Sequence, residues 1–166
     1  MDRTVGVMLA VVLGLLALGA VVLSGHHAFA SNTASTVVTD ISQLETNARA
    51  QFGQGSNLYT SFTTANESAM ITGGLFPTDM VRGGAVVDAW GNAVTLAPAA
   101  NNTEGTISFG GGGSETTDEC TTAVTAMKDY VSMTVGGTTF TQANQPDSVS
   151  AANACAGGLA IALTFQ

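Results

Sequence analysis

The sequence predicts an α+β fold, in which one long N-terminal helix packs on a globular domain with a mostly antiparallel sheet. The chain of 166 residues opens with an uncharged, almost wholly apolar stretch from residue 5 to residue 23. A helical spacing of apolar residues continues to residue 52. Behind it, short stretches with strand propensity alternate with glycine turns and short helical stretches. This order, a long helix followed by mixed short elements, predicts the fold class.

The apolar stretch predicts a helix over residues 1–24 that is buried on all sides. The run from residue 5 to residue 23, at ~1.5 Å per residue, spans roughly 28 Å, about the hydrocarbon thickness of a bilayer. Burial in lipid, burial against other protein and removal as a signal peptide would all account for it. Arg3 and the sequence Ala28-Phe29-Ala30 fit a signal peptide. The run is longer than the usual signal core, which favours a transmembrane or assembly helix.

Residues 25–53 are expected to continue this helix with one apolar face. The apolar face follows steps of four, three, four and four residues through Val37, Ile41, Leu44, Ala48 and Phe52. Polar residues fill the opposite face: Asn32, Thr39, Asp40, Gln43, Glu45, Asn47 and Arg49. Gly53 stands where such a helix would end.

The remaining residues, 54–166, are expected to form one globular head. Its first half predicts a helix over 61–73 and two strands, 85–90 and 93–96, joined by a tight turn at Gly91-Asn92. A further strand is expected over 106–109.

The second half of the head begins with a flexible glycine-rich break at 110–113. A helix over 117–131 follows, with Cys120, Val124, Met127 and Val131 expected on one side. The last elements are expected to be a hairpin around Gly136-Gly137, a short helix and a closing strand, over 132–135, 138–141, 147–155 and 159–165.

Composition excludes several classes of function. Four basic residues against 12 acidic ones give a net charge of −8, so no nucleic-acid partner is expected. The abundance of small residues suits a surface that packs against copies of itself or faces the cell exterior. No nucleophile motif accompanies the two histidines, so no catalytic residue, enzyme activity or cofactor is expected.

Two groups of side chains raise the question of metal binding. His26 and His27 are interpreted as polar residues beyond the apolar segment, because the cysteines lie far from them in sequence and complete no zinc motif. Glu115, Asp118 and Glu119 could bind a cation, but their place at a helix start favours interaction with the helix dipole. No metal site is therefore expected.

The two cysteines, Cys120 and Cys155, favour a disulfide in an oxidising compartment, because an even count accompanies a membrane or export segment. Two free thiols remain the alternative at this stage.

The order of these elements resembles a type IV pilin of the type IVb subgroup. The resemblance rests on the apolar N-terminal helix, the two C-terminal cysteines and the text ITGGLFPTDMVRGGAVVDAWGNAVTLAP at residues 71–98. That text contains a Pro-x-Asp-Met sequence and a Trp-Gly turn between strands, at Trp90-Gly91. The region between Cys120 and Cys155 is similar to the disulfide-bounded region of that subgroup.

The resemblance implies a pilin fold and a structural role. A subunit of this family is held in the inner membrane by its apolar helix, processed and N-methylated by a prepilin peptidase, and stacked by assembly machinery into an extracellular filament. The apolar helices then form the filament core. The alternatives are a minor pilin, a pseudopilin of a secretion system, or a membrane-anchored or secreted adhesin-like binding domain.

The extreme N-terminus departs from the family pattern. The family carries glutamate at mature position five, and if Met1 is the mature residue, Val5 stands there. Asp2 is the one acidic residue before Asp40, so the hypothesis is that its carboxylate pairs with a neighbouring N-terminal amine. The alternative is that Asp2 and Arg3 lie at the membrane surface or pair with each other.

Overall fold

The first described element is a helix over residues 32–52, in a computed structural model that describes residues 32–166. Its buried positions, Ala34, Val37, Ile41, Leu44 and Ala48, are fully shielded from solvent, as the three- and four-residue spacing predicts. The helix ends at Gly53, whose amide donates to the Arg49 carbonyl at 3.0 Å. The predicted helix is confirmed over this range. The predicted segment 1–24 and the residues up to 31 lie outside the described part.

None of the helices within residues 32–166 is both long and apolar enough to cross a membrane.

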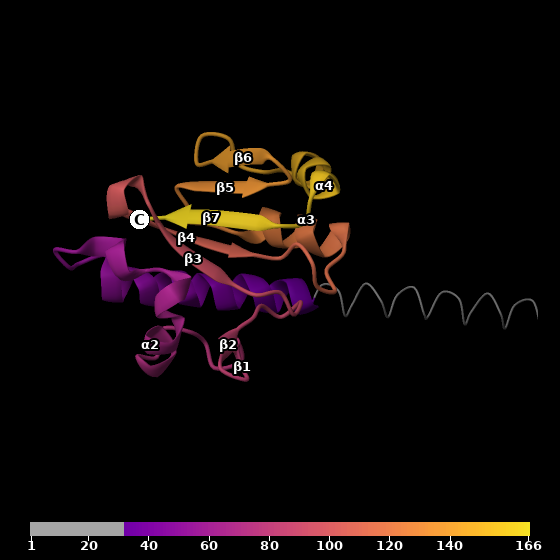
Figure 1. The fold of residues 1–166 in the computed structure, drawn as a ribbon. Coiled ribbons are helices and arrows are strands. Elements are labelled where there is room, and N and C mark those ends of the chain that lie inside the picture. The colour runs from indigo at the N-terminus through magenta and orange to yellow at the C-terminus, as the bar shows by residue number, and fades with distance from the viewer. Residues whose placement is uncertain (1–31) are drawn as a thin grey trace, which may run out of the picture.

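Two acidic residues of the polar face of this helix are buried. Asp40 is 6% exposed and Glu45 is 3% exposed. Figure 1 shows the reason: the helix lies between the five-stranded sheet on one side and α2 (Glu67–Thr72) with its neighbouring short strands on the other. A helix covered on two sides buries the residues that flank its apolar face.

The predicted helix over 61–73 is divided in the structure. Two short 3₁₀ turns, η1 (Leu58–Ser61) and η2 (Thr64–Asn66), precede α2. Thr63 has an extended backbone, φ −136° and ψ 148°, which separates the two turns. The expected end is confirmed, because α2 stops at Gly73.

The predicted hairpin over 85–96 is confirmed only in part, because its two stretches pair through one antiparallel bridge, flanked by backbone bonds from Val94 N to Val86 O at 3.0 Å and from Asp88 N to Asn92 O at 2.9 Å. β2 (Ala85–Val86) pairs instead with β1 (Val81–Arg82), and β3 (Thr95–Ala99) pairs with β4 (Glu104–Phe109). A single bridge, Val87 to Ala93, joins the two stretches. The tight turn at Gly91 exists, with φ +93°, but it closes around the side chain of Asp88 rather than around a strand ladder.

The main sheet has five antiparallel strands in the order β3-β4-β7-β5-β6. The expected hairpin is confirmed as β5 (Ser132–Val135) and β6 (Thr138–Thr141), and the closing strand as β7 (Ile161–Phe165). Although β7 comes last in the chain, it is the central strand. Alternate residues of β4, β5 and β7 point into one core. These buried residues are Ile107, Phe109, Met133, Val135, Ile161, Leu163 and Phe165.

Two helices accompany the sheet. α3 (Thr117–Ala126) is shorter than the predicted 117–131 and ends at Met127, whose backbone is extended at φ −61° and ψ 138°. Val131 therefore lies beyond the helix and is 41% exposed, contrary to its predicted place on the buried side. α4 (Ser148–Gly157) confirms the short C-terminal helix and begins after Asp147, which caps its first turn.

Candidate functional site

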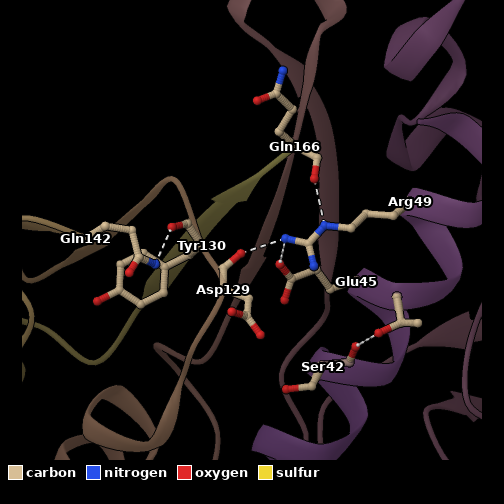
Figure 2. A network of polar contacts seen from close by, with 8 residues as sticks. Ser42, Glu45, Arg49, Asp129, Tyr130, Gln142 and Gln166 are labelled. Atoms are coloured by element: carbon tan, nitrogen blue, oxygen red, sulfur yellow. Dashed lines mark hydrogen bonds and ion pairs between the residues drawn. The ribbon is translucent and has the colours of Figure 1, made fainter. Parts of the chain in front are cut away.

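A polar cluster around Arg49 joins three distant parts of the chain (Figure 2). Arg49 Nε donates to the backbone oxygen of Gln166 at 2.6 Å, and Nη2 donates to the backbone oxygen of Asp129 at 2.6 Å. The same Nη2 forms an ion pair with Glu45 Oε1 at 2.6 Å. The guanidinium also stacks over Phe165, with Cζ 5.5 Å from the ring centroid. Arg49 thus ties the first helix to the end of β7 and to the loop after α3.

Burial in this cluster makes ionisation of the Glu45 carboxyl less favourable. Its burial raises the pKa of the carboxyl to about 7, with a smaller upward effect of Asp129, while the positive charge of Arg49 acts in the opposite direction. The Glu45 carboxyl therefore titrates near neutral pH, and the Arg49 guanidinium compensates the charge of its ionised form.

Replacing Arg49 with methionine is expected to lower the free energy of unfolding by about 2 kcal/mol, because a buried carboxyl and two backbone oxygens lose their shared donor. Adding Glu45→Gln should recover about 1 kcal/mol, because it removes the uncompensated charge. Urea denaturation of the full chain in mild detergent measures both. The control is Lys128→Met, since this exposed lysine donates one bond, to Thr125 at 3.3 Å. Equal losses at positions 49 and 128 would contradict the assignment.

A second charged group lies on the other covered side of the helix. Asp40 is buried near Asp79 and Arg82, and its pKa is raised to about 6. Desolvation is the main cause, Asp79 adds to the rise, and Arg82 acts against it. Arg82 itself is positioned by a 3.2 Å bond from its Nε to the Asp79 backbone oxygen.

The raised pKa of Asp40 makes stability depend on pH. The folded protein holds this proton more tightly than the unfolded chain, in which the pKa of Asp40 is 3.8, so the stabilising contribution is full below pH 3.8, declines above it and is lost as the pH rises through 6. We expect the free energy of unfolding to rise from pH 8 to pH 5, with Glu45 contributing in the same direction. Asp40→Asn should stabilise the chain by about 1 kcal/mol at pH 8 and flatten this rise. Urea titrations at both pH values test this, and an Asn variant with an unchanged slope would refute it.

A third cluster explains the glycine-rich loop. Asp88, 1% exposed, accepts hydrogen bonds from Asn92 N at 2.8 Å and Gly110 N at 2.9 Å. Glu115 Oε1 accepts from the amides of Gly111 and Gly112, and the Asn92 side-chain nitrogen bridges the two carboxyls at 3.1 Å from each. The expected flexible break is therefore a loop held by two buried carboxylates.

Internal contacts account for two of the three acidic residues considered as a cation site, Glu115 and Glu119. The pKa of Glu115 lies below its usual range: burial acts to raise it, while the bonds from Asn92, Gly111 and Gly112 together lower it. Glu119 forms a capping box with Thr116 at the start of α3. Among residues 32–166, no group of three or more histidine, cysteine or acidic side chains is placed to hold a metal ion.

The disulfide region joins α3 to α4. Cys120 and Cys155 are bonded at 2.03 Å and are both buried, so the bond lies within the contact between the two helices. Trp90 is also buried, at 3% exposure, and stacks on Phe109 with ring centroids 6.5 Å apart. Trp90 is thus part of the hydrophobic core.

Apart from Cys120 and Cys155, which form the predicted disulfide, sequence reasoning placed its site residues outside the described range. Met1, Asp2 and Val5 lie outside the described residues, as do His26 and His27. It missed the Arg49, Asp40 and Asp88 clusters. The four-residue spacing of Glu45 and Arg49 predicts an ion pair on one helix face. The other two partners of Arg49 lie 80 and 117 residues further along the chain, so no local pattern indicates them.

Comparisons with known proteins agree with this architecture. The family described as PilS N terminal matches residues 31–166. The chain is similar to the type IVb pilin from Salmonella typhi, with 18% sequence identity over 80% of this chain and 97% of that chain and a TM-score of 0.58. It is also similar to TcpA, a type IV pilin from the El Tor biotype of Vibrio cholerae, with 14% identity over 82% of this chain and 97% of that chain and a TM-score of 0.48. No curated protein matches the chain in sequence.

Proposed function

Since the chain belongs to the PilS N-terminal family and has the fold of a type IVb pilin, we propose that it is the major subunit of an extracellular type IV pilus. The single observation that carries the proposal is that the N-terminal sequence contains two separate apolar parts, one of which packs against the head. The head buries the apolar face of residues 34–48, because Val37, Ile41 and Leu44 are fully shielded from solvent against it. The uncharged run of residues 5–23 is a separate apolar segment that needs its own partner.

Two partners suit that run in succession. Lipid of the inner membrane would hold it before assembly, and the same segments of neighbouring copies would hold it in the filament core. Gly6, Ala10 and Gly14 are small residues at four-residue spacing, which permits close approach of packed helices. Prepilin peptidase and the pilus assembly machinery are the further partners of this proposal.

Electron microscopy of sheared surface material tests the proposal. Filaments that contain this chain as their main component support a major subunit. Filaments in which it is a trace component indicate a minor pilin, and a monomer that stays in the membrane fraction indicates an anchored binding domain. Mass spectrometry of the N-terminus adds a direct readout, since an N-methyl group on Met1 would establish prepilin processing, whereas a start at Ser31 would establish signal cleavage.

Asp2→Ala is expected to reduce filament number at least tenfold, because Asp2 is the carboxylate proposed to neutralise a neighbour's N-terminal amine in the core. Immunoblots of sheared filaments, normalised to total subunit in the membrane, measure the change. Asp2→Glu keeps the charge and should retain most assembly. Unchanged filament yield in the alanine variant would reject the role of Asp2.

A further inference from the structure

The surface of the head carries a groove next to the Arg49 cluster. It has a volume of about 450 Å³ and is lined by Arg49, Asp129, Tyr130, Val131, Gln142 and Gln166; we call it the Arg49 groove. Its wall includes Val131, whose side chain is 41% exposed. The bonds of Arg49 use Nε and Nη2, which leaves the hydrogens of Nη1 without a partner within residues 32–166. The groove therefore offers the apolar side chain of Val131 and the Nη1 group of the positively charged Arg49 guanidinium.

The other large exposed apolar side chain within residues 32–166 is Val149, at 69% exposure. It lies in the first turn of α4, beside Asp147. The Asp147 carboxylate caps the helix through Oδ1, which accepts from the amides of Val149 and Ser150, and Oδ2 has no bond in the described part of the chain. The start of α4 thus presents a valine and an acidic oxygen, which are complementary to Val131 and Arg49.

These two surfaces lie at opposite ends of the head. Figure 1 shows α4 at one end of the sheet and the C-terminus, where Gln166 lines the groove, at the other. The first helix runs between these two ends. Complementary patches at opposite ends of one molecule cannot meet within a copy, but they can meet between copies stacked along that direction.

Charge limits the choice of contact. The chain has a net charge of −8, so two copies repel unless a contact sets an acidic group against one of the four basic residues. Arg49 is one of three basic residues in the described range. Asp129 adds a carboxylate to the groove, but Figure 2 shows that its side chain points away from the guanidinium.

We infer that the start of α4 in one copy, with Val149 and Asp147, docks into the Arg49 groove of the next copy. Such a contact is heterologous, and repeating it builds an open helical filament rather than a closed ring when the rotation does not close. The inference rests on the proposed filament function and names two head surfaces that would join its subunits.

Cysteine cross-linking tests the contact on filaments of the full chain. Both native cysteines are in the disulfide, and residues 32–166 contain no free one, so new thiols report their own neighbours. The double variant Val131→Cys with Val149→Cys is expected to give a ladder of oligomers on non-reducing gels after oxidation. Each single variant should stay monomeric, and Thr139→Cys with Val149→Cys is the matched control. Filaments without a ladder overturn the inference, and cross-linking of a single variant overturns its head-to-tail geometry.

Charge exchange provides a second readout if the cysteine variants assemble poorly. Val131→Asp and Val149→Asp should each lower filament yield at least tenfold, and Val131→Lys combined with Val149→Asp should restore most of it. No restoration overturns the contact. Absence of filaments from the unaltered chain overturns the proposed function itself, whereas normal filaments from both aspartate variants reject the docking surface and leave that function intact.

Discussion

Replacing Cys120 and Cys155 together with alanine is expected to lower the free energy of unfolding by about 4 kcal/mol. The disulfide closes a loop across a separation of 35 residues, and chain entropy assigns that much stabilisation to a loop of this length. The bond also lies inside the α3–α4 contact, where both cysteines are buried. Without it, α4 is held by its packing against α3 and by its buried Ala151 and Ala154.

Urea denaturation of the full chain in mild detergent measures the effect. Reduction of the unaltered chain with dithiothreitol should reproduce the loss without any substitution. Cys120→Ala alone should resemble the double variant, because one cysteine cannot form the bond. A loss below about 1 kcal/mol in both the reduced chain and the double variant would show that helix packing alone secures this region.

Asp88→Ala is expected to cost about 3 kcal/mol, the second largest effect. The substitution leaves the backbone amides of Gly110 and Asn92 without their buried acceptor, and it removes one of the two carboxyl groups that accept from the Asn92 side-chain nitrogen. It also releases the turn that sends β2 and β3 to different partners. Asp88→Asn keeps the shape and one acceptor oxygen, but it turns an amide nitrogen toward existing donors, so a loss of about 2 kcal/mol is expected.

The control for Asp88 is Glu104→Ala, which removes an acidic side chain that makes no hydrogen bond within residues 32–166. A change within about 0.5 kcal/mol is expected there. Thermal unfolding followed by tryptophan fluorescence suits these variants, because the single Trp90 lies in the same turn and is buried. An Asp88→Ala variant as stable as the control would contradict the role of the cluster.

Local patterns in the sequence were sufficient for several elements. The spacing of Val37, Ile41 and Leu44 identified a helix and its buried face, since that pattern depends on the helical period alone. Gly136-Gly137 identified the β5–β6 hairpin, because both residues have positive φ, +53° and +82°, as a tight turn requires.

Patterns of the same kind predicted less accurately where a residue distant in sequence contacts the segment. The Gly91-Asn92 signal predicts a hairpin, but the pairing on either side of this turn is limited to one bridge, and the Asp88 carboxylate in the turn also accepts from Gly110, 22 residues away. The predicted helix over 117–131 is longer than α3, which ends at Ala126, because Met127 turns the chain toward the loop that contacts Arg49.

The sequence by itself determined the helix over residues 32–52 and the antiparallel character of the head, because these depend on periodicity and turn residues, and its motif order carried the resemblance to the pilin family. Only the tertiary structure decided that β7 is the central strand, that Asp40 and Glu45 are buried, and that Arg49 joins the helix to the sheet. Each of these follows from contacts between residues far apart in the chain. The covering of one helix from two sides changes the environment of a carboxylate without leaving any mark in its local sequence.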